Sequence, residues 1–99
     1  MNVSLENIIE KSNEKPVIVD FYADWCGPCK MLSPVLDKIE KEEDIVVARV
    51  DVDKNQSLAQ KHGVRSIPTV KLFKGGKEVD TFIGFRDKNQ IKEWINNHA

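Results

Sequence analysis

The sequence lacks the features that mark several classes of protein. Its 99 residues include only two cysteines, and 15 Lys and Arg nearly balance 16 Asp and Glu. A net charge of −1 argues against a nucleic-acid module, which would need a concentrated basic face. No apolar stretch approaches the roughly 18 residues of a membrane-spanning helix. Because the first residues also lack the basic start and apolar core of a secretory signal, we expect a cytoplasmic protein, or a mature form without its leader.

The remaining composition is that of a globular domain. Apolar residues make up 40% of the chain, and no internal repeat or Pro/Ser-rich linker interrupts it. This length suits one compact domain, which can bury a sufficient core without a disulfide or a metal. We therefore treat residues 1–99 as a single domain.

Apolar patterning predicts a strand, a helix and a second strand in the first half of the chain. Residues 17–22 are apolar on both faces except at Asp20, which is typical of a central strand covered on both sides. Residues 45–50 form a similar run. Between them lies an apolar stripe at helical spacing, made of Leu32, Val35, Leu36 and Ile39. This order predicts a right-handed unit in which the two strands are parallel.

The second half predicts a short helix over residues 56–62, a hairpin and a final helix. Residues 68–73 and 79–83 flank Gly75-Gly76, a strong hairpin signal that makes these strands antiparallel. Asp87 caps the final helix, with Gln90 at the capping-box position. Together the elements predict an α/β fold, a mixed sheet with helices on both faces.

A first helix precedes this unit. Ser4 is a good N-cap, and Val3 and Ile8 have the spacing of a hydrophobic staple across the helix start. We expect the helix to end between Asn13 and Pro16.

The two cysteines form one Cys-x-x-Cys motif, with Gly27 and Pro28 between Cys26 and Cys29. The motif follows a central parallel strand and opens a helix, at the edge where sites collect in α/β sheets. Unpaired N–H groups and the helix dipole stabilise a thiolate there, so we expect the pKa of Cys26 to lie below the ordinary thiol value. Cys29 is three residues on, within reach of a disulfide. The pair can therefore cycle between dithiol and disulfide.

Asp20 is a candidate proton acceptor. It interrupts an apolar strand, so burial should raise its pKa. From that strand it can lie beneath the helix start and reach Cys29, directly or through water. A carboxylate poised nearer neutrality can take the proton of Cys29. The alternative is a carboxylate that only binds backbone groups or Arg49.

Two other interpretations of the cysteine pair are a structural disulfide and half of a zinc site. A structural zinc site takes four protein ligands, and only His62 and His98 could complete the set. His62 precedes a helix-ending glycine and His98 is penultimate, where helices fray. We therefore interpret both as ordinary helix-end residues and expect no metal site.

The motif and its surroundings resemble the thioredoxin family. Trp25-Cys-Gly-Pro-Cys-Lys30 follows Val19-Asp-Phe-Tyr-Ala23 and precedes Ser66-Ile-Pro-Thr69 in the order and spacing of that family. The resemblance extends from about Pro16 to the C-terminus. It implies a thioredoxin fold and a protein-disulfide reductase that works through a reversible Cys26–Cys29 disulfide.

The resemblance also implies roles for individual residues. Cys26 attacks a substrate disulfide and Cys29 resolves the mixed disulfide. Pro68 is a cis-proline that faces the cysteines, and Ile67 presents its backbone to the substrate. The docking groove is bordered by Trp25, Ile83, Gly84 and Phe85. The family uses no tightly bound cofactor, and the implied partners are disulfide-containing proteins and a thioredoxin reductase, with the chain itself a monomer.

The sequence departs from the family pattern at four points. Arg49 stands where Lys is frequent, Tyr22 where Trp is frequent, and Phe85 where a small residue is frequent. The N-terminal segment is short, so we expect the first edge strand to be abbreviated or missing. The rival function is a redox-passive binding module that uses the apolar surface around Trp25 and Phe85.

Overall fold

The computed structural model describes residues 4–98. Its elements are α1 (Leu5–Glu10), η1 (Lys11–Asn13), β1 (Val17–Tyr22), α2 (Gly27–Glu42), β2 (Val46–Asp51), α3 (Gln56–Lys61), β3 (Thr69–Lys74), β4 (Lys77–Ile83) and α4 (Lys88–Asn96). Every predicted element is present. No helix within this part of the chain is long and apolar enough to cross a membrane.

The sheet has the strand order β2-β1-β3-β4. β1 is parallel to β2 and antiparallel to β3, and β3 is antiparallel to β4, which confirms both the strand–helix–strand unit and the hairpin. Gly75 and Gly76 have φ values of 62° and 79°, as a two-residue hairpin turn requires. Within residues 4–98 no strand precedes β1, so β2 forms one edge of the sheet, in agreement with the expected loss of a first edge strand.

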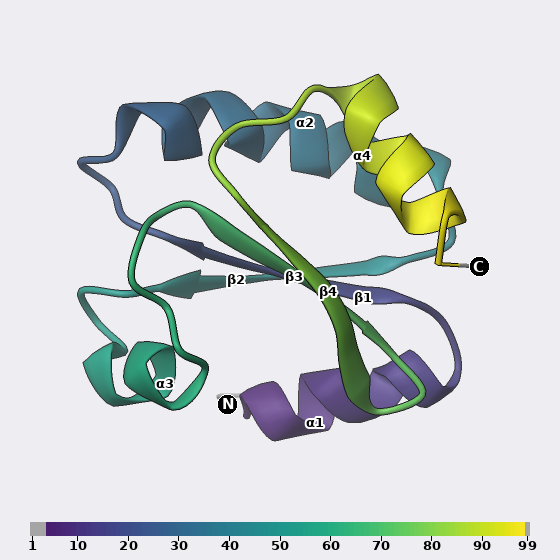
Figure 1. The fold of residues 1–99 in the computed structure, drawn as a ribbon, viewed down its shortest axis with the longest axis horizontal. Coiled ribbons are helices and arrows are strands. Elements are labelled where there is room, and N and C mark those ends of the chain that lie inside the picture. Colours follow the sequence, from purple (N-terminus) through teal and green to yellow (C-terminus); the bar gives the residue numbers. More distant parts are fainter. Residues whose placement is uncertain (1–3, 99) are drawn as a thin grey trace.

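Helices α2 and α4 cover one face of the sheet, and α1 and α3 cover the other (Figure 1). Side chains alternate between these faces along β1, because successive strand residues point in opposite directions. Val17, Val19 and Phe21 pack on the α1 side. Ile18 packs on the α2 side, in a core that also contains Leu32, Leu36, Ile39, Ile91, Trp94 and Ile95. The predicted helical stripe therefore faces the sheet.

Side-chain caps fix the helix ends. The Ser4 hydroxyl accepts a hydrogen bond from the N–H of Asn7, and Asp87 and Gln90 form the predicted capping box. The staple expected between Val3 and Ile8 involves a residue outside the described range. α1 ends at Glu10 and continues as a 3-10 turn to Asn13, as expected for a helix that stops before Pro16.

The fold brings three loops together at one end of the sheet. The loop after β1 leads into α2, and the loop after β2 lies beside it because the two strands are parallel. The loop before β3 carries Pro68 to the same end, because β3 starts opposite Phe21, near the end of β1. The cysteines lie where these loops meet.

Candidate functional site

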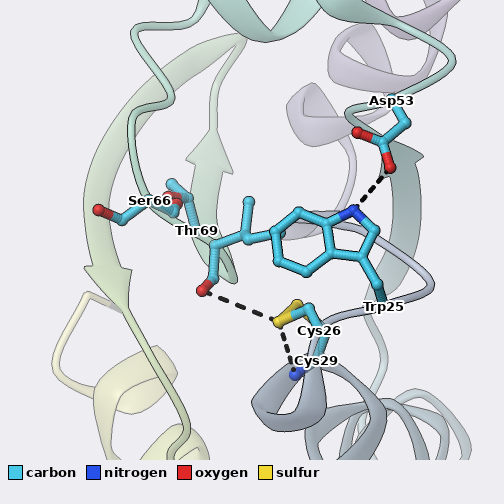
Figure 2. Close-up of a disulfide and its surroundings, with 7 residues drawn as sticks. Trp25, Cys26, Cys29, Asp53, Ser66 and Thr69 are labelled. Carbon is cyan, nitrogen blue, oxygen red and sulfur yellow. Dashed lines mark hydrogen bonds between the residues drawn. A yellow bond between two sulfur atoms is a disulfide. The ribbon is translucent and has the colours of Figure 1, made fainter.

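Cys26 and Cys29 form a disulfide at the start of α2 (Figure 2). Cys26 is the N-cap residue, one position before the first helical residue, and its Sγ accepts a hydrogen bond of 3.2 Å from the N–H of Cys29. The two Cα atoms are 5.2 Å apart, within the range that a disulfide needs. An orphan amide at the helix start thus points at Cys26 Sγ, as the sequence predicted.

The loop before β3 closes over the same sulfur. The Ile67–Pro68 peptide is cis, as the resemblance implied, and the carbonyl oxygen of Ile67 lies 3.9 Å from Cys26 Sγ. The carbonyl oxygen of Pro68 accepts a 2.9 Å hydrogen bond from the N–H of Gly84, whose φ of 93° favours glycine. This bond ties the end of β4 to the cis-proline loop and so brings Ile83 and Gly84 to the site.

Trp25 is 70% exposed and lies beside the disulfide (Figure 2). Its indole N–H donates a 2.8 Å hydrogen bond to Asp53 Oδ2. The Asp53 N–H in turn donates to Asp51 Oδ1 at 2.9 Å, which steadies the loop after β2. Sequence reasoning missed Asp53. The only signal was that parallel strands β1 and β2 end at the same sheet edge, so the residues that follow them are neighbours.

Several large apolar side chains of the described residues are exposed to solvent. Besides Trp25, Ile83 is 63% exposed and Phe85 is 42% exposed, and both were predicted to border the docking groove. Met31, which is 60% exposed, was not predicted, although its position off the buried stripe of α2 could have identified it. We call Trp25, Ile67, Ile83 and Phe85 the apolar rim.

Asp20 lies beneath the start of α2 and is only 1% exposed. Its Oδ1 has no hydrogen-bond partner. Burial raises the pKa of Asp20 to about 6, against a smaller opposing effect of the positive charge on Arg49. A carboxyl group with this pKa gains and loses a proton near neutrality, as predicted from its place in an apolar strand.

A cavity of about 280 Å³ joins Asp20 to Cys29. Its other lining residues are Tyr22, Asp24, Lys30, Ser33 and Arg49. Charged and polar side chains contribute to its lining, and the cavity is large enough to hold water molecules that could bridge the carboxyl group and the sulfur. The structure thus brings Asp20 and Cys29 together as the sequence predicted.

The two histidines do not join the cysteines. The His62 ring packs 5.6 Å from the Phe21 ring on the opposite face of the sheet. His98 follows the end of α4, and its Nε2 lies 2.8 Å from Asp80 Oδ2. Within residues 4–98 no three His, Cys, Asp or Glu side chains gather in a way that could hold a metal ion.

Comparisons with known proteins agree with this geometry. A family model of thioredoxin matches residues 2–97. The chain is 45% identical to a thioredoxin of Rickettsia bellii, over 93% of this chain and 96% of that protein. It is also 45% identical to a thioredoxin of Chlamydia caviae, over 98% of this chain and 96% of that protein.

Solved structures give the same answer. The fold matches a thioredoxin variant from Halobacterium salinarum with a TM-score of 0.89 at 40% identity, covering 98% of this chain and 84% of that one. It matches the thioredoxin of Fasciola hepatica with a TM-score of 0.87 at 38% identity, covering 96% and 91% of the two chains. The family's general partners are disulfide-containing proteins and a reductase. With its redox-capable cysteine pair, the chain belongs to the thioredoxin family of thiol–disulfide oxidoreductases, which reduce protein disulfides.

Proposed function

We propose that Cys26 attacks the substrate disulfide and that Cys29 completes the reaction. In the reduced protein the Cys26 thiolate attacks one sulfur of the substrate. The substrate S–S bond breaks, its second sulfur leaves as a thiolate, and a mixed disulfide to Cys26 forms. The N–H of Cys29, which points at Cys26 Sγ, supports this order because it stabilises the negative charge of the attacking sulfur.

Asp20 serves the second step. Its carboxylate takes the proton of the Cys29 thiol, and the resulting thiolate attacks Cys26 Sγ. The mixed disulfide breaks, the substrate leaves with two added electrons, and the Cys26–Cys29 bond forms. The shared cavity and the pKa of about 6 support this role, because the carboxylate is ionised at neutral pH yet basic enough to accept a proton.

The surrounding residues bind the substrate. The apolar rim contacts the side chains next to the substrate disulfide, and the Ile67 backbone and Gly84 lie against its main chain. Gly27 and Pro28, both exposed, leave the approach to Cys26 open. Pro68 holds the Ile67 carbonyl beside the sulfur.

We propose that residues 1–99 act as one domain, a cytoplasmic monomer without a bound cofactor. A thioredoxin reductase returns two electrons to the Cys26–Cys29 disulfide after each cycle.

The observation that carries the proposal is the Cys26–Cys29 disulfide with its sulfur capping α2. Insulin reduction by the wild type, Cys26→Ser and Cys29→Ser tests it. We expect both variants to lose turnover, and only Cys29→Ser to accumulate a covalent adduct with substrate by mass spectrometry, because its captured substrate is never released. Lys38→Ala, an exposed change on α2 away from the cysteines, serves as the control.

The outcomes separate the alternatives. Adduct formation by Cys26→Ser instead would reverse the roles of the two cysteines. If both serine variants sustain the biological role of the protein, the redox-passive binding module is correct.

A further inference from the structure

The guanidinium of Arg49 is held on α2. Its Nη2 donates to Asp37 Oδ1 at 2.8 Å and to the carbonyl oxygen of Ser33 at 2.7 Å. Its Nη1 donates to the Ser33 hydroxyl. Both acceptor residues belong to α2, on successive turns of the same helix face. Three hydrogen bonds, one of them to a charged partner, restrain this side chain more than a single surface ion pair does.

Arg49 would otherwise be the natural partner of Asp20. The two residues are opposite each other in the parallel pair of β1 and β2, so their side chains leave the same face of the sheet. Both line the cavity that reaches Cys29. Yet none of the guanidinium's hydrogen bonds goes to Asp20, and Asp20 Oδ1 is buried without a partner.

We propose that Asp37 is a positioning residue which, together with Ser33, holds Arg49 against α2 and away from Asp20, and so keeps Asp20 a competent proton acceptor. The inference rests on the proton transfer from Cys29 to Asp20 proposed above. Asp37 touches neither substrate nor the cysteines. It acts by fixing the position of the guanidinium whose positive charge acts on Asp20.

Among the groups around Asp20, Arg49 is the one through which Asp37 can change the pKa of Asp20. Tyr22, Asp24, Cys29 and Lys30 also line the cavity, from β1, the loop after it and α2. On β3, the residue paired with Asp20 is the apolar Val70. Arg49 is the only one of the groups in the cavity that lowers the pKa of Asp20, and Asp37 is bonded to it directly.

Loss of Asp37 should lower the pKa of Asp20. It removes a negative charge that partly neutralises Arg49, and it releases the guanidinium to approach Asp20. Both effects favour the ionised carboxylate, so the pKa of Asp20 falls. A more acidic Asp20 is a weaker base toward Cys29, and the acid limb of the turnover profile moves to lower pH with it.

The test measures Asp20 itself in the reduced protein, from the pH dependence of its carboxyl carbon signal by NMR. We expect Asp37→Ala to lower the pKa of Asp20 by about 0.5 to 1. Asp37→Asn, which keeps an acceptor oxygen, gives a smaller decrease. The matched control is Glu40→Gln, one turn further along α2, where Glu40 accepts a hydrogen bond from the N–H of Val47 and does not contact Arg49.

A double-mutant cycle with Arg49→Met establishes the route. If Asp37 acts through Arg49, Asp37→Ala has little effect on Asp20 in the Arg49→Met background. Equal decreases in the two backgrounds, or an equal decrease in Glu40→Gln, would mean that Asp37 acts only as a distant charge and would overturn the proposal.

The pH profile of insulin reduction then separates this inference from the proposed function. If the acid limb moves by the same amount as the pKa of Asp20, both stand. If the pKa of Asp20 moves and the turnover profile does not, Asp37 positions Arg49 as proposed, but Asp20 is not the proton acceptor. An unchanged pKa of Asp20 in Asp37→Ala refutes the positioning role, whatever the turnover does.

Discussion

Two aspartates of this protein have opposite surroundings. Asp80, on β4, accepts hydrogen bonds of 2.8 Å from the N–H of Thr81 and from the indole of Trp94, and its Oδ2 also lies 2.8 Å from His98 Nε2. These partners, the Thr81 amide first, lower the pKa of Asp80. Asp20 has a buried oxygen with no partner, and burial raises its pKa. Asp80 is thus a paired carboxylate of the scaffold, whereas Asp20 keeps an unpaired oxygen, which fits the proton-accepting role proposed for it.

The two tryptophans show the same division. Each donates a 2.8 Å hydrogen bond to an aspartate, Trp25 to Asp53 and Trp94 to Asp80. Trp94 is only 7% exposed and packs edge-on against the Phe82 ring at 4.9 Å, whereas Trp25 is 70% exposed beside Cys26. The same pairing thus anchors a core residue in one region and holds an exposed side chain, proposed above to bind substrate, in the other.

The largest expected effect is on stability, and it tests whether the two tryptophans differ as described. Trp94→Ala should lower the free energy of unfolding by about 3 to 5 kcal/mol, because it empties a core position. Trp25→Ala should cost less than about 1 kcal/mol, because most of that side chain is already in water. Urea unfolding of both variants measures the difference, with Trp94→Phe as a milder variant. A similar loss in both would show that Trp25 is a structural residue.

Trp25→Ala should also separate binding from stability. We expect its KM for insulin to rise while its rate with a small disulfide stays near that of the wild type, because a small substrate needs little of the apolar rim. An unchanged KM would remove Trp25 from the docking surface.

Asp20→Asn should stabilise the protein at neutral pH. The folded-state pKa of about 6 exceeds the ordinary value of 3.8, so the wild type is favoured while Asp20 is protonated and loses stability as the pH rises between those values. At about pH 7.5 the shift corresponds to a gain of about 3 kcal/mol for the variant, and near pH 4 the two proteins should nearly coincide. Urea unfolding at both pH values, in one redox state, measures this. A gap that does not grow with pH would place Asp20 in an ordinary environment.

Asp80→Asn should have the smaller and opposite effect. Its carboxylate is partly exposed, so we expect a loss of about 1 kcal/mol at neutral pH. Because the folded-state pKa of Asp80 is lowered, this contribution exists above the ordinary carboxyl pKa and disappears in acid, where variant and wild type converge. Thermal unfolding at neutral and acid pH checks the sign. Destabilisation that persists unchanged in acid would mean that packing, not charge, decides the role of Asp80.

The elements that local chemistry controls could be predicted from the sequence. The helical stripe of α2, the Gly75-Gly76 turn and the cap at Asp87 each depend on neighbours a few residues away. β4 was predicted to begin at Val79 and begins at Lys77. The charged residues 77 and 78 break the apolar pattern, and a register shift at Leu72/Phe73 brings them into pairing.

The side-chain pairs that tune the site could not be predicted in this way. The Trp25–Asp53 hydrogen bond joins residues 28 positions apart in the sequence. The bond between Asp37 and Arg49 joins a residue of α2 to a residue of β2. Such partners depend on how helices pack on the sheet, and no local periodicity encodes that packing. Asp20 could be predicted because a single charged residue in a buried strand is itself the signal.

The exposed edge of β2 bears on how copies of the protein behave at high protein concentration. The N–H of Val47 on that edge is already occupied by Glu40, and the charged side chain of Arg49 stands two residues on. A capped amide and a charged side chain both discourage the strand-to-strand association to which open sheet edges are prone. These features of the β2 edge support the monomeric state proposed above for an electron carrier that diffuses between donor and acceptor.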